Sequence, residues 1–419
     1  MKMNERYRIR RENAFHPIGK DAMLVLYSGE AVPCSMDACY PFEANHHFFY
    51  LTGLRRENMA LVLRTTEGKL RTALFIEEPL PKDERWTGRR MRKEEAEEIS
   101  GIGDVRYLSE LPACLSRCCA REGLETVYFD CYRNSMRDAE MYNLAMARRF
   151  HEKYPAIALR DAHPVLARLR MRKDEAEIAE IQKAVFCTNE GLKRVLSRIG
   201  PGMKESAAQT EFEYALRVSG AEGVAFPTIA GAGANACMLH YEENDGWMGE
   251  GDLLLLDLGA RCNGYCADIS RTYPVNGRYT PRQREFYDLV LKANREVAAF
   301  AAPGRTLKEL NERCKAILAE GLMKLSKIEK PEDVGTYYMH SVSHHLGMDP
   351  HDAAADENMP LQPGMVITDE PGLYIDEERI GIRIEDDLLI TDDGCIVLSD
   401  GIARDADEIE ALMSRGKSA

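Results

Sequence analysis

Hydrophobic residues follow different patterns in the two parts of the chain. Up to about residue 160, short apolar runs alternate with charged stretches, at residues 23–27, 48–51, 60–63, 72–76 and 127–129. This alternation is typical of an α/β domain. The pattern changes near residues 163–173, so we expect one domain at 1–168 and a second at 169–419.

The second domain is expected to begin with two helices. Asp174 can cap a helix with Glu177 three residues later, and apolar residues then recur at helical spacing at positions 178, 181, 185 and 192. A Pro-Gly pair at 201–202 ends that pattern, and a second amphipathic segment covers 204–219.

A β-hairpin with two carboxylates is expected next. Residues 252–259 predict a buried strand that contains Asp257, and Asn263-Gly264 is a strong signal for a two-residue turn before a returning strand at 265–275. In that register Asp257 lies opposite Ser270, and Asp268 lies opposite Gly259. Both carboxylates then share one face, about 7–8 Å apart at the backbone, where they could converge on one or two cations.

More acids and histidines gather further along the chain. Four of the ten histidines lie within residues 340–351, and the offset of four between His340 and His344 places them on one side of a helix or strand. Glu370 is expected at a strand end, and Arg383 and Glu385 on one face of another strand. An Asp–Arg ion pair and satisfied core histidines are the alternative interpretations.

Composition and charge exclude several classes of protein. The net charge of −14 has the wrong sign for binding a nucleic acid backbone. No apolar run approaches the ~18 residues of a membrane span, and the charged N-terminus develops no apolar signal segment, so a cytoplasmic location is expected. The 12 cysteines form no C-x-x-C pair and are expected to be reduced thiols.

The candidate ligands point to a particular metal chemistry. Asp257, Asp268, His344, Glu370 and Glu385 together offer four carboxylates, one imidazole and no thiolate. This set suits Mn²⁺ or a similar ion better than structural zinc. Four carboxylates would neutralise two divalent cations, and paired ions activate water, so hydrolysis is the expected reaction class.

The order Asp-x(10)-Asp, His, Glu, Glu resembles the ligand pattern of the pita-bread metallopeptidases, and specifically of the Xaa-Pro aminopeptidase (aminopeptidase P) family. The likeness is dense from Thr228 to Ile390. Its motifs are Leu-His240-Tyr, Gly264-Tyr-x-x-Asp268-Ile-Ser-Arg-Thr, His340-x-x-x-His344-x-Leu-Gly, His351-Asp, Glu370-Pro-Gly-Leu-Tyr374 and Arg383-Ile-Glu385-Asp. The fold it implies is a creatinase-like N-terminal α/β domain followed by a pita-bread catalytic domain.

The resemblance also implies an activity and roles for these residues. The activity is release of the N-terminal residue from peptides with proline in second position, with two divalent ions, Mn²⁺ first and Co²⁺ or Zn²⁺ as alternatives, in a homo-oligomer (dimer or tetramer). The implied ligands are Asp257 on one ion, Asp268 and Glu385 bridging both, and His344 and Glu370 completing the sites. Glu370 would also accept a proton from the attacking water, His351, His340 and His240 would face the substrate, and Arg383 and Tyr374 would orient the ligands.

Some positions depart from the family pattern, and rival interpretations remain. Asp369 and His345 stand where the family commonly has an apolar and an aromatic residue, and Trp86 matches a segment that can reach a neighbouring subunit. A prolidase that cleaves only Xaa-Pro dipeptides shares the ligands, and a non-catalytic peptide-binding relative would have lost them. A dinucleotide fingerprint at 231–236 is disfavoured because no helix pattern follows it.

Overall fold

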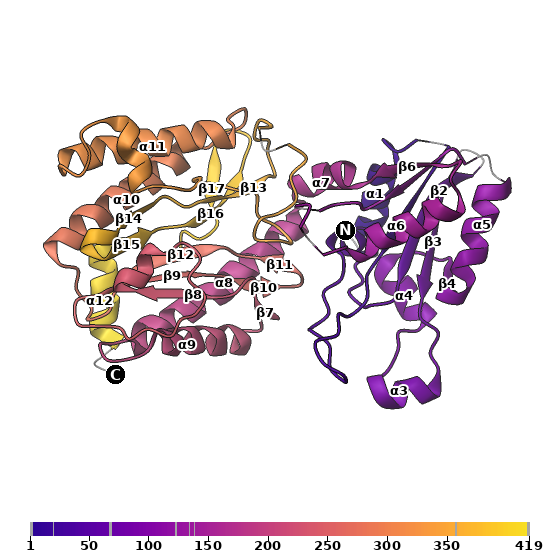
Figure 1. Ribbon diagram of the computed structural model, residues 1–419, viewed down its shortest axis with the longest axis horizontal. Coiled ribbons are helices and arrows are strands. Elements are labelled where there is room, and N and C mark those ends of the chain that lie inside the picture. Colours follow the sequence, from indigo (N-terminus) through magenta and orange to yellow (C-terminus); the bar gives the residue numbers. More distant parts are fainter. Residues whose placement is uncertain are drawn as a thin grey trace. The chain divides into compact units, whose positions relative to one another are not determined.

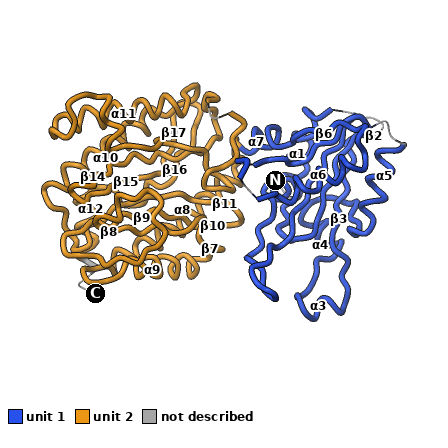
Figure 2. The backbone as a smooth tube through the Cα atoms, in the orientation of Figure 1, with its two compact units in different colours: residues 1–170 blue, residues 171–419 orange. Residues whose placement is uncertain are grey.

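Two units divide the chain, Met1–Arg170 and Met171–Ala419 (Figure 2). The computed structural model describes residues 3–19, 21–66, 69–121, 124–133, 135–137, 139–356 and 358–416. Each unit is built from both strands and helices (Figure 1). Within the described residues, no helix has both the length and the apolar character needed to cross a membrane.

The N-terminal unit is built on one six-stranded mixed sheet with the order β4-β3-β2-β1-β5-β6. β1 runs antiparallel to β2 and parallel to β5. The strands are β1 (Ala22–Tyr27), β2 (Ala60–Thr66), β3 (Lys69–Ile76), β4 (Val105–Tyr107), β5 (Thr126–Phe129) and β6 (Ala158–Asp161). Four of the five apolar runs in the sequence therefore lie in strands, while residues 48–51 lie in a helix.

Helices cover both faces of this sheet. Among the residues described, the α-helices are α1 (Met3–Phe15), α2 (His46–Thr52), α3 (Pro81–Thr87), α4 (Lys93–Ser100), α5 (Leu111–Arg121), α6 (Tyr142–Lys153) and α7 (His163–Met171). On one face, α5 and α6 pack on a core that includes Val25, Val62 and Phe129. On the other, α1, α2 and α4 contact one another, with α2 against β1 and α1 against β2. Burying both faces accounts for the continuous apolar runs in the strands.

The described part of the C-terminal unit holds four small antiparallel sheets. Their strand orders are β12-β9-β8, β11-β10-β7, β13-β16-β17 and β14-β15. The strands are β7 (Gly223–Val224), β8 (Ile229–Ala232), β9 (Leu253–Leu258), β10 (Ala260–Cys262), β11 (Tyr265–Cys266), β12 (Ile269–Pro274), β13 (Val366–Asp369), β14 (Gly372–Ile375), β15 (Ile380–Arg383), β16 (Asp386–Ile390) and β17 (Cys395–Val397). Contacts of β12 with β15 and β16 join the sheets.

Helices flank these strands, with α10 and α11 on one side and α8 and α9 on the other (Figure 1). They are α8 (Glu175–Arg198), α9 (Glu205–Val218), α10 (Pro281–Phe300), α11 (Leu307–Lys324) and α12 (Ala406–Gly416). The two helices expected from the sequence are confirmed as α8 and α9. The segment after Gly231 forms a short 3₁₀ helix, Gly233–Cys237, and no α-helix follows it before the next strand, as expected for a segment that is not a dinucleotide fingerprint.

The predicted hairpin is confirmed in its register. Cys262 pairs with Tyr265 across the Asn263-Gly264 turn, and Ser270 pairs with Asp257. Both turn residues have positive φ, 45° and 79°, as a two-residue hairpin turn requires. At Gly259 a Cβ atom would lie 1.8 Å from the carbonyl oxygen of Ala267. Only glycine at position 259 therefore allows the two backbones to come this close to each other beside the two carboxylates.

The N-cap of α8 yields a stability prediction. The Asp174 carboxylate accepts hydrogen bonds from the backbone N–H groups of Ala176 and Glu177, at 3.0 and 2.9 Å. Asp174→Ala removes both hydrogen bonds, which share the acceptor Oδ1, and should lower the free energy of unfolding of the C-terminal unit by about 1 kcal/mol. Asp174→Asn keeps an acceptor and should retain most of the stabilisation that the cap provides. Urea denaturation measures both, and equal losses in the two variants would contradict the cap.

Candidate metal centre

The five candidate ligands reach one region of the C-terminal unit from five separate segments. Asp257 lies on β9, and Asp268 comes one residue before β12. His344 lies in an irregular loop, so the expected helix or strand around residues 340–344 does not form. Glu370 directly follows β13, at the strand end as expected, and Glu385 lies between β15 and β16.

Three of these side chains form the centre of the site. One ligand atom each from Asp268, His344 and Glu385 lie within 4.8 Å of one another, close enough to share a cation. Nε2 of His344 lies 3.6 Å from Oδ2 of Asp268 and 3.4 Å from Oε1 of Glu370. The structure thus brings Glu370 to the same imidazole nitrogen. The charge of Asp257 lies close enough to raise the pKa values of Asp268 and Glu385.

The tautomer of His344 is fixed by its surroundings. Its Nδ1 lies 3.2 Å from the carbonyl oxygen of His345, so Nδ1–H donates and Nε2 carries the lone pair toward the carboxylates. Burial, together with the neighbouring His351, lowers the pKa of His344 to about 3. The imidazole is therefore neutral at ordinary pH and oriented as a metal ligand requires.

Arg383 joins the ligands to the histidine loop. Its Nη2 donates to Oδ2 of Asp257 at 2.7 Å, its Nε donates to Ser270 Oγ, and its Nη1 donates to the hydroxyl of Tyr374 at 2.7 Å. Nδ1–H of His340 donates to its neighbour's carbonyl, so Nε2 accepts from the Tyr374 hydroxyl at 2.9 Å. The Asp–Arg ion pair weighed as an alternative for Asp257 is thus present, but it occupies only one carboxylate oxygen.

The electrostatics of the site fit divalent cations. Burial and neighbouring carboxylates raise the pKa values of Asp268 and Glu370 well above their usual range, and burial with Asp257 raises the pKa of Glu385 to about 8. Oδ1 of Asp257 is buried and accepts no hydrogen bond. A site this crowded with like charges needs protons or cations, and its carboxylate and imidazole donors are suited to Mn²⁺ or similar ions.

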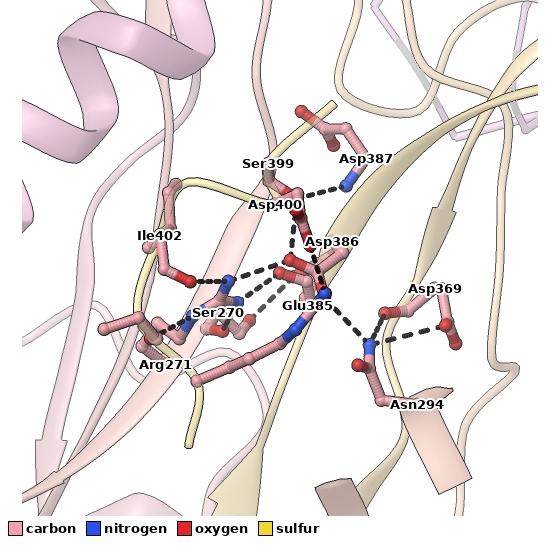
Figure 3. Close-up of polar contacts among 12 residues, drawn as sticks. Ser270, Arg271, Asn294, Asp369, Glu385, Asp386, Asp387, Ser399, Asp400 and Ile402 are labelled. Carbon is pink, nitrogen blue, oxygen red and sulfur yellow. Dashed lines mark hydrogen bonds and ion pairs between the residues drawn. The ribbon is translucent and has the colours of Figure 1, made fainter. Parts of the chain in front are cut away.

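Arg271, whose role is not predictable from the sequence pattern, stabilises the backbone behind the ligands (Figure 3). Its guanidinium is fully buried and pairs with Asp386 at 2.8 Å. It also donates to the carbonyl oxygens of Glu385 at 2.6 Å and Ser270 at 2.9 Å. The Ser270 hydroxyl donates to Oε2 of Glu385 at 2.7 Å. Three successive polar residues in a buried strand, Ser270 to Thr272, were the signal that could have identified this network.

The two departures from the family pattern are both buried. Asp369 accepts a hydrogen bond from the amide of Asn294, which also donates to Asp386 at 3.1 Å (Figure 3). Burial and the nearby Asp386 raise the pKa of Asp369 well above its usual range. The pKa of His345 is lowered to about 4, mainly by burial and then by Lys173.

Two further histidines lie beside the ligands. The ring of His351 stacks on His344 with centroids 3.8 Å apart and leaves part of the side chain exposed. His240 is exposed and close enough to lower the pKa of His340. Trp86, which belongs to the N-terminal unit, is 86% exposed on α3.

A second group of metal-ligand types, His47, Asp130 and His163, lies in the N-terminal unit. Arg170 can only donate, so Nδ1 of His47 is the acceptor in their 3.3 Å contact. Nε2–H of His47 then donates to Nδ1 of His163 at 3.0 Å. This order of donors satisfies both ring nitrogens of His47 without a cation.

Comparisons with known proteins agree with this geometry. Residues 179–392 match metallopeptidase family M24, and residues 7–128 match the aminopeptidase P N-terminal domain. The chain is 32% identical to the Xaa-Pro aminopeptidase of Escherichia coli, over 98% of this chain and 97% of that protein.

Solved structures extend the likeness to three dimensions. A Bacillus anthracis protein assigned to aminopeptidase P has a TM-score of 0.97 and 38% identity, with 99% of both chains covered. Aminopeptidase P from E. coli with the inhibitor Pro-Leu has a TM-score of 0.89 and 31% identity, with 99% of both chains covered. The expected fold, a creatinase-like N-terminal domain followed by a pita-bread domain, is confirmed.

The raised carboxyl pKa values predict how metal binding depends on pH. Without metal, Glu385 with its pKa of about 8 holds a proton at neutral pH. A divalent cation must displace it, so binding should release protons and become tighter as pH rises from 6 to 8. Calorimetry in buffers of different ionisation enthalpy measures this release. Glu385→Gln should weaken binding and reduce the release, and a pH-independent affinity would contradict this account.

Proposed function

The chain belongs to metallopeptidase family M24, and from that premise we propose that it is a metal-dependent Xaa-Pro aminopeptidase. It would release the N-terminal residue from peptides whose second residue is proline. The observation that carries the proposal is the group of Asp268, His344 and Glu385, joined by Glu370 and backed by Arg383. A non-catalytic relative would have no reason to retain this set of buried like charges.

The proposed cofactor is a pair of divalent ions, most favourably Mn²⁺, with Co²⁺ or Zn²⁺ as alternatives. Asp257 would bind one ion, Asp268 and Glu385 would bridge both, and His344 and Glu370 would complete the two sites. When bound, such ions lower the pKa of water and polarise the carbonyl oxygen under attack. The absence of thiolate from the ligand set supports an ion that prefers oxygen and imidazole donors.

The protein's own groups would carry the remaining steps. Glu370, whose pKa is raised by burial and by Glu385, would accept a proton from the attacking water. His351 and His340 would steady the developing charge on the substrate, and His240 would lie on the substrate side. Arg383 and Tyr374 would hold Asp257 and His340 in place through the hydrogen bonds described above.

Location and assembly stay predictions. A cytoplasmic location is part of this proposal and is not tested by the structure. The exposed Trp86 on α3 fits a homo-oligomer, dimer or tetramer, in which this side chain is covered by another copy. Prolidase is the runner-up activity, because it would use the same ligands and differ in how the pocket treats the substrate carboxylate.

Peptide specificity tests the proposed activity. Proline has a fixed φ and no backbone N–H, so a pocket shaped for its ring excludes most other residues. The Mn²⁺-loaded protein should release the first residue from Xaa-Pro-Xaa tripeptides and longer peptides, and leave matched Xaa-Ala-Xaa peptides largely intact. Mass spectrometry of the products shows this.

Two other outcomes would overturn the proposal. Cleavage confined to Xaa-Pro dipeptides would identify a prolidase. No cleavage of any peptide with Mn²⁺, Co²⁺ or Zn²⁺ would favour a peptide-binding protein. Metal-free protein is the control, because any cleavage it retains belongs to a contaminating peptidase.

His351 should act on the substrate without being needed for metal binding. His351→Ala should keep both metal ions, because its ring touches His344 from outside the ligand group. Its kcat should fall by about 10²-fold or more through lost transition-state stabilisation. Elemental analysis and steady-state kinetics check the two parts, and unchanged kcat with full metal content would show that His351 is structural.

A further inference from the structure

A fully desolvated ion pair lies beneath the histidine loop, outside the ligand group. Nζ of Lys173 lies 3.1 Å from Oδ2 of Asp352, and both side chains are only 1% exposed. Lys173 directly precedes Asp174, the N-cap of α8, whereas Asp352 directly follows His351. The pair thus joins the start of the helix to the loop that carries His344 and His351.

The loop is shaped to receive this pair. Gly347 has no side chain, and a Cβ there would lie 2.2 Å from Oδ2 of Asp352 and 3.0 Å from Cε of Lys173. The backbone N–H of Asp352 donates to the carbonyl of His345 at 2.8 Å, which closes the loop on itself. The backbone N–H of Lys173 donates to Gly364 at 2.7 Å, so the lysine is held from both ends.

Stability alone does not explain a buried pair of this kind. Removing two charges from water costs several kcal/mol, and packed hydrophobic residues in their place are often equally stable or more so. The pair instead fixes the position of the Asp352 carboxylate, because a carboxylate held by a buried ammonium group has one preferred position. That position fixes the backbone next to His351, whose ring stacks on His344 at 10° between planes.

We propose that Lys173 is a positioning residue that acts through Asp352 on His351. It holds the imidazole of His351 against His344 and at the place where the substrate carbonyl is attacked. This inference rests on the proposed function for its kinetic consequences, but not for its structural ones. A displacement of about 1 Å in a group that stabilises the transition state can lower the rate by up to about 10²-fold.

Kinetics of Lys173→Met and Asp352→Asn test the proposal. Both should keep two metal ions and a KM within about twofold of the wild type, while kcat falls by about 10-fold to 10²-fold. Lys193→Met is the matched control, because Lys193 lies on α8, the helix that begins just after Lys173, and its pair with Glu190 is 59% exposed at the lysine. That control should retain wild-type kcat.

The double variant Lys173→Met/His351→Ala separates positioning from general damage. If Lys173 acts through His351, the double variant should be no slower than His351→Ala alone. Losses that multiply, or an unchanged kcat in Lys173→Met and Asp352→Asn, would overturn the proposal. Should Lys173→Met fail to fold, Asp352→Asn preserves the side-chain volume and carries the same test.

A spectroscopic measurement that needs no catalysis tests this inference independently of the proposed activity. The chain has ten histidines, so ¹⁵N-histidine NMR can follow His351, with the signal that His351→Ala removes as its assignment. Lys173→Met should shift that signal and leave the N-terminal histidines unmoved. If the wild-type protein cleaves no peptide, the proposed function fails, and the NMR spectrum alone then shows whether Lys173 positions His351. A lower Tm with an unmoved His351 signal would show a purely structural role.

Discussion

Repulsion among buried and partly buried carboxylates is the constraint on which the rest of the C-terminal unit depends. Burial and neighbouring carboxylates, Asp257 among them, raise the pKa values of Asp268, Glu370 and Glu385. Each therefore needs a proton, a cation or a guanidinium group. Arg383 supplies one such group at Asp257, and ligand atoms of Asp268, His344 and Glu385 lie within 4.8 Å of one another, where a cation could be shared.

Two adjacent carboxyl groups in this region have pKa values that are shifted in opposite directions. Glu385 and Asp386 are neighbours in sequence, yet the pKa of Glu385 is raised to about 8, while that of Asp386 is lowered to about 2. Burial would raise both, but Arg271 and Arg404 outweigh it at Asp386. One carboxyl is thus available to a metal, and the other anchors the backbone that holds it (Figure 3).

The sequence predicts local features well where a short motif determines them. Asn263-Gly264 fixed the hairpin register, and with it the pairing of Asp257 with Ser270. The positions of Glu370 after β13 and of Arg383 beside the ligands were likewise predictable from alternation and resemblance. The buried ion pairs were not, because their partners are brought together only by tertiary packing: Lys173 and Asp352 are 179 residues apart. No periodicity distinguishes such a lysine from a surface one.

The separation of the ligands along the chain has a consequence for biosynthesis. The donors begin at Asp257 and end at Glu385, in five segments that come together only when β9, β12, β13 and β15 have all docked. A nascent chain that has not yet emerged past Glu385 holds only part of the set, so an ion bound early would meet a different and weaker group of donors. Selection among the ions of the cell is therefore deferred until translation of the C-terminal unit is nearly complete, when the finished fold imposes its own geometry on the ion.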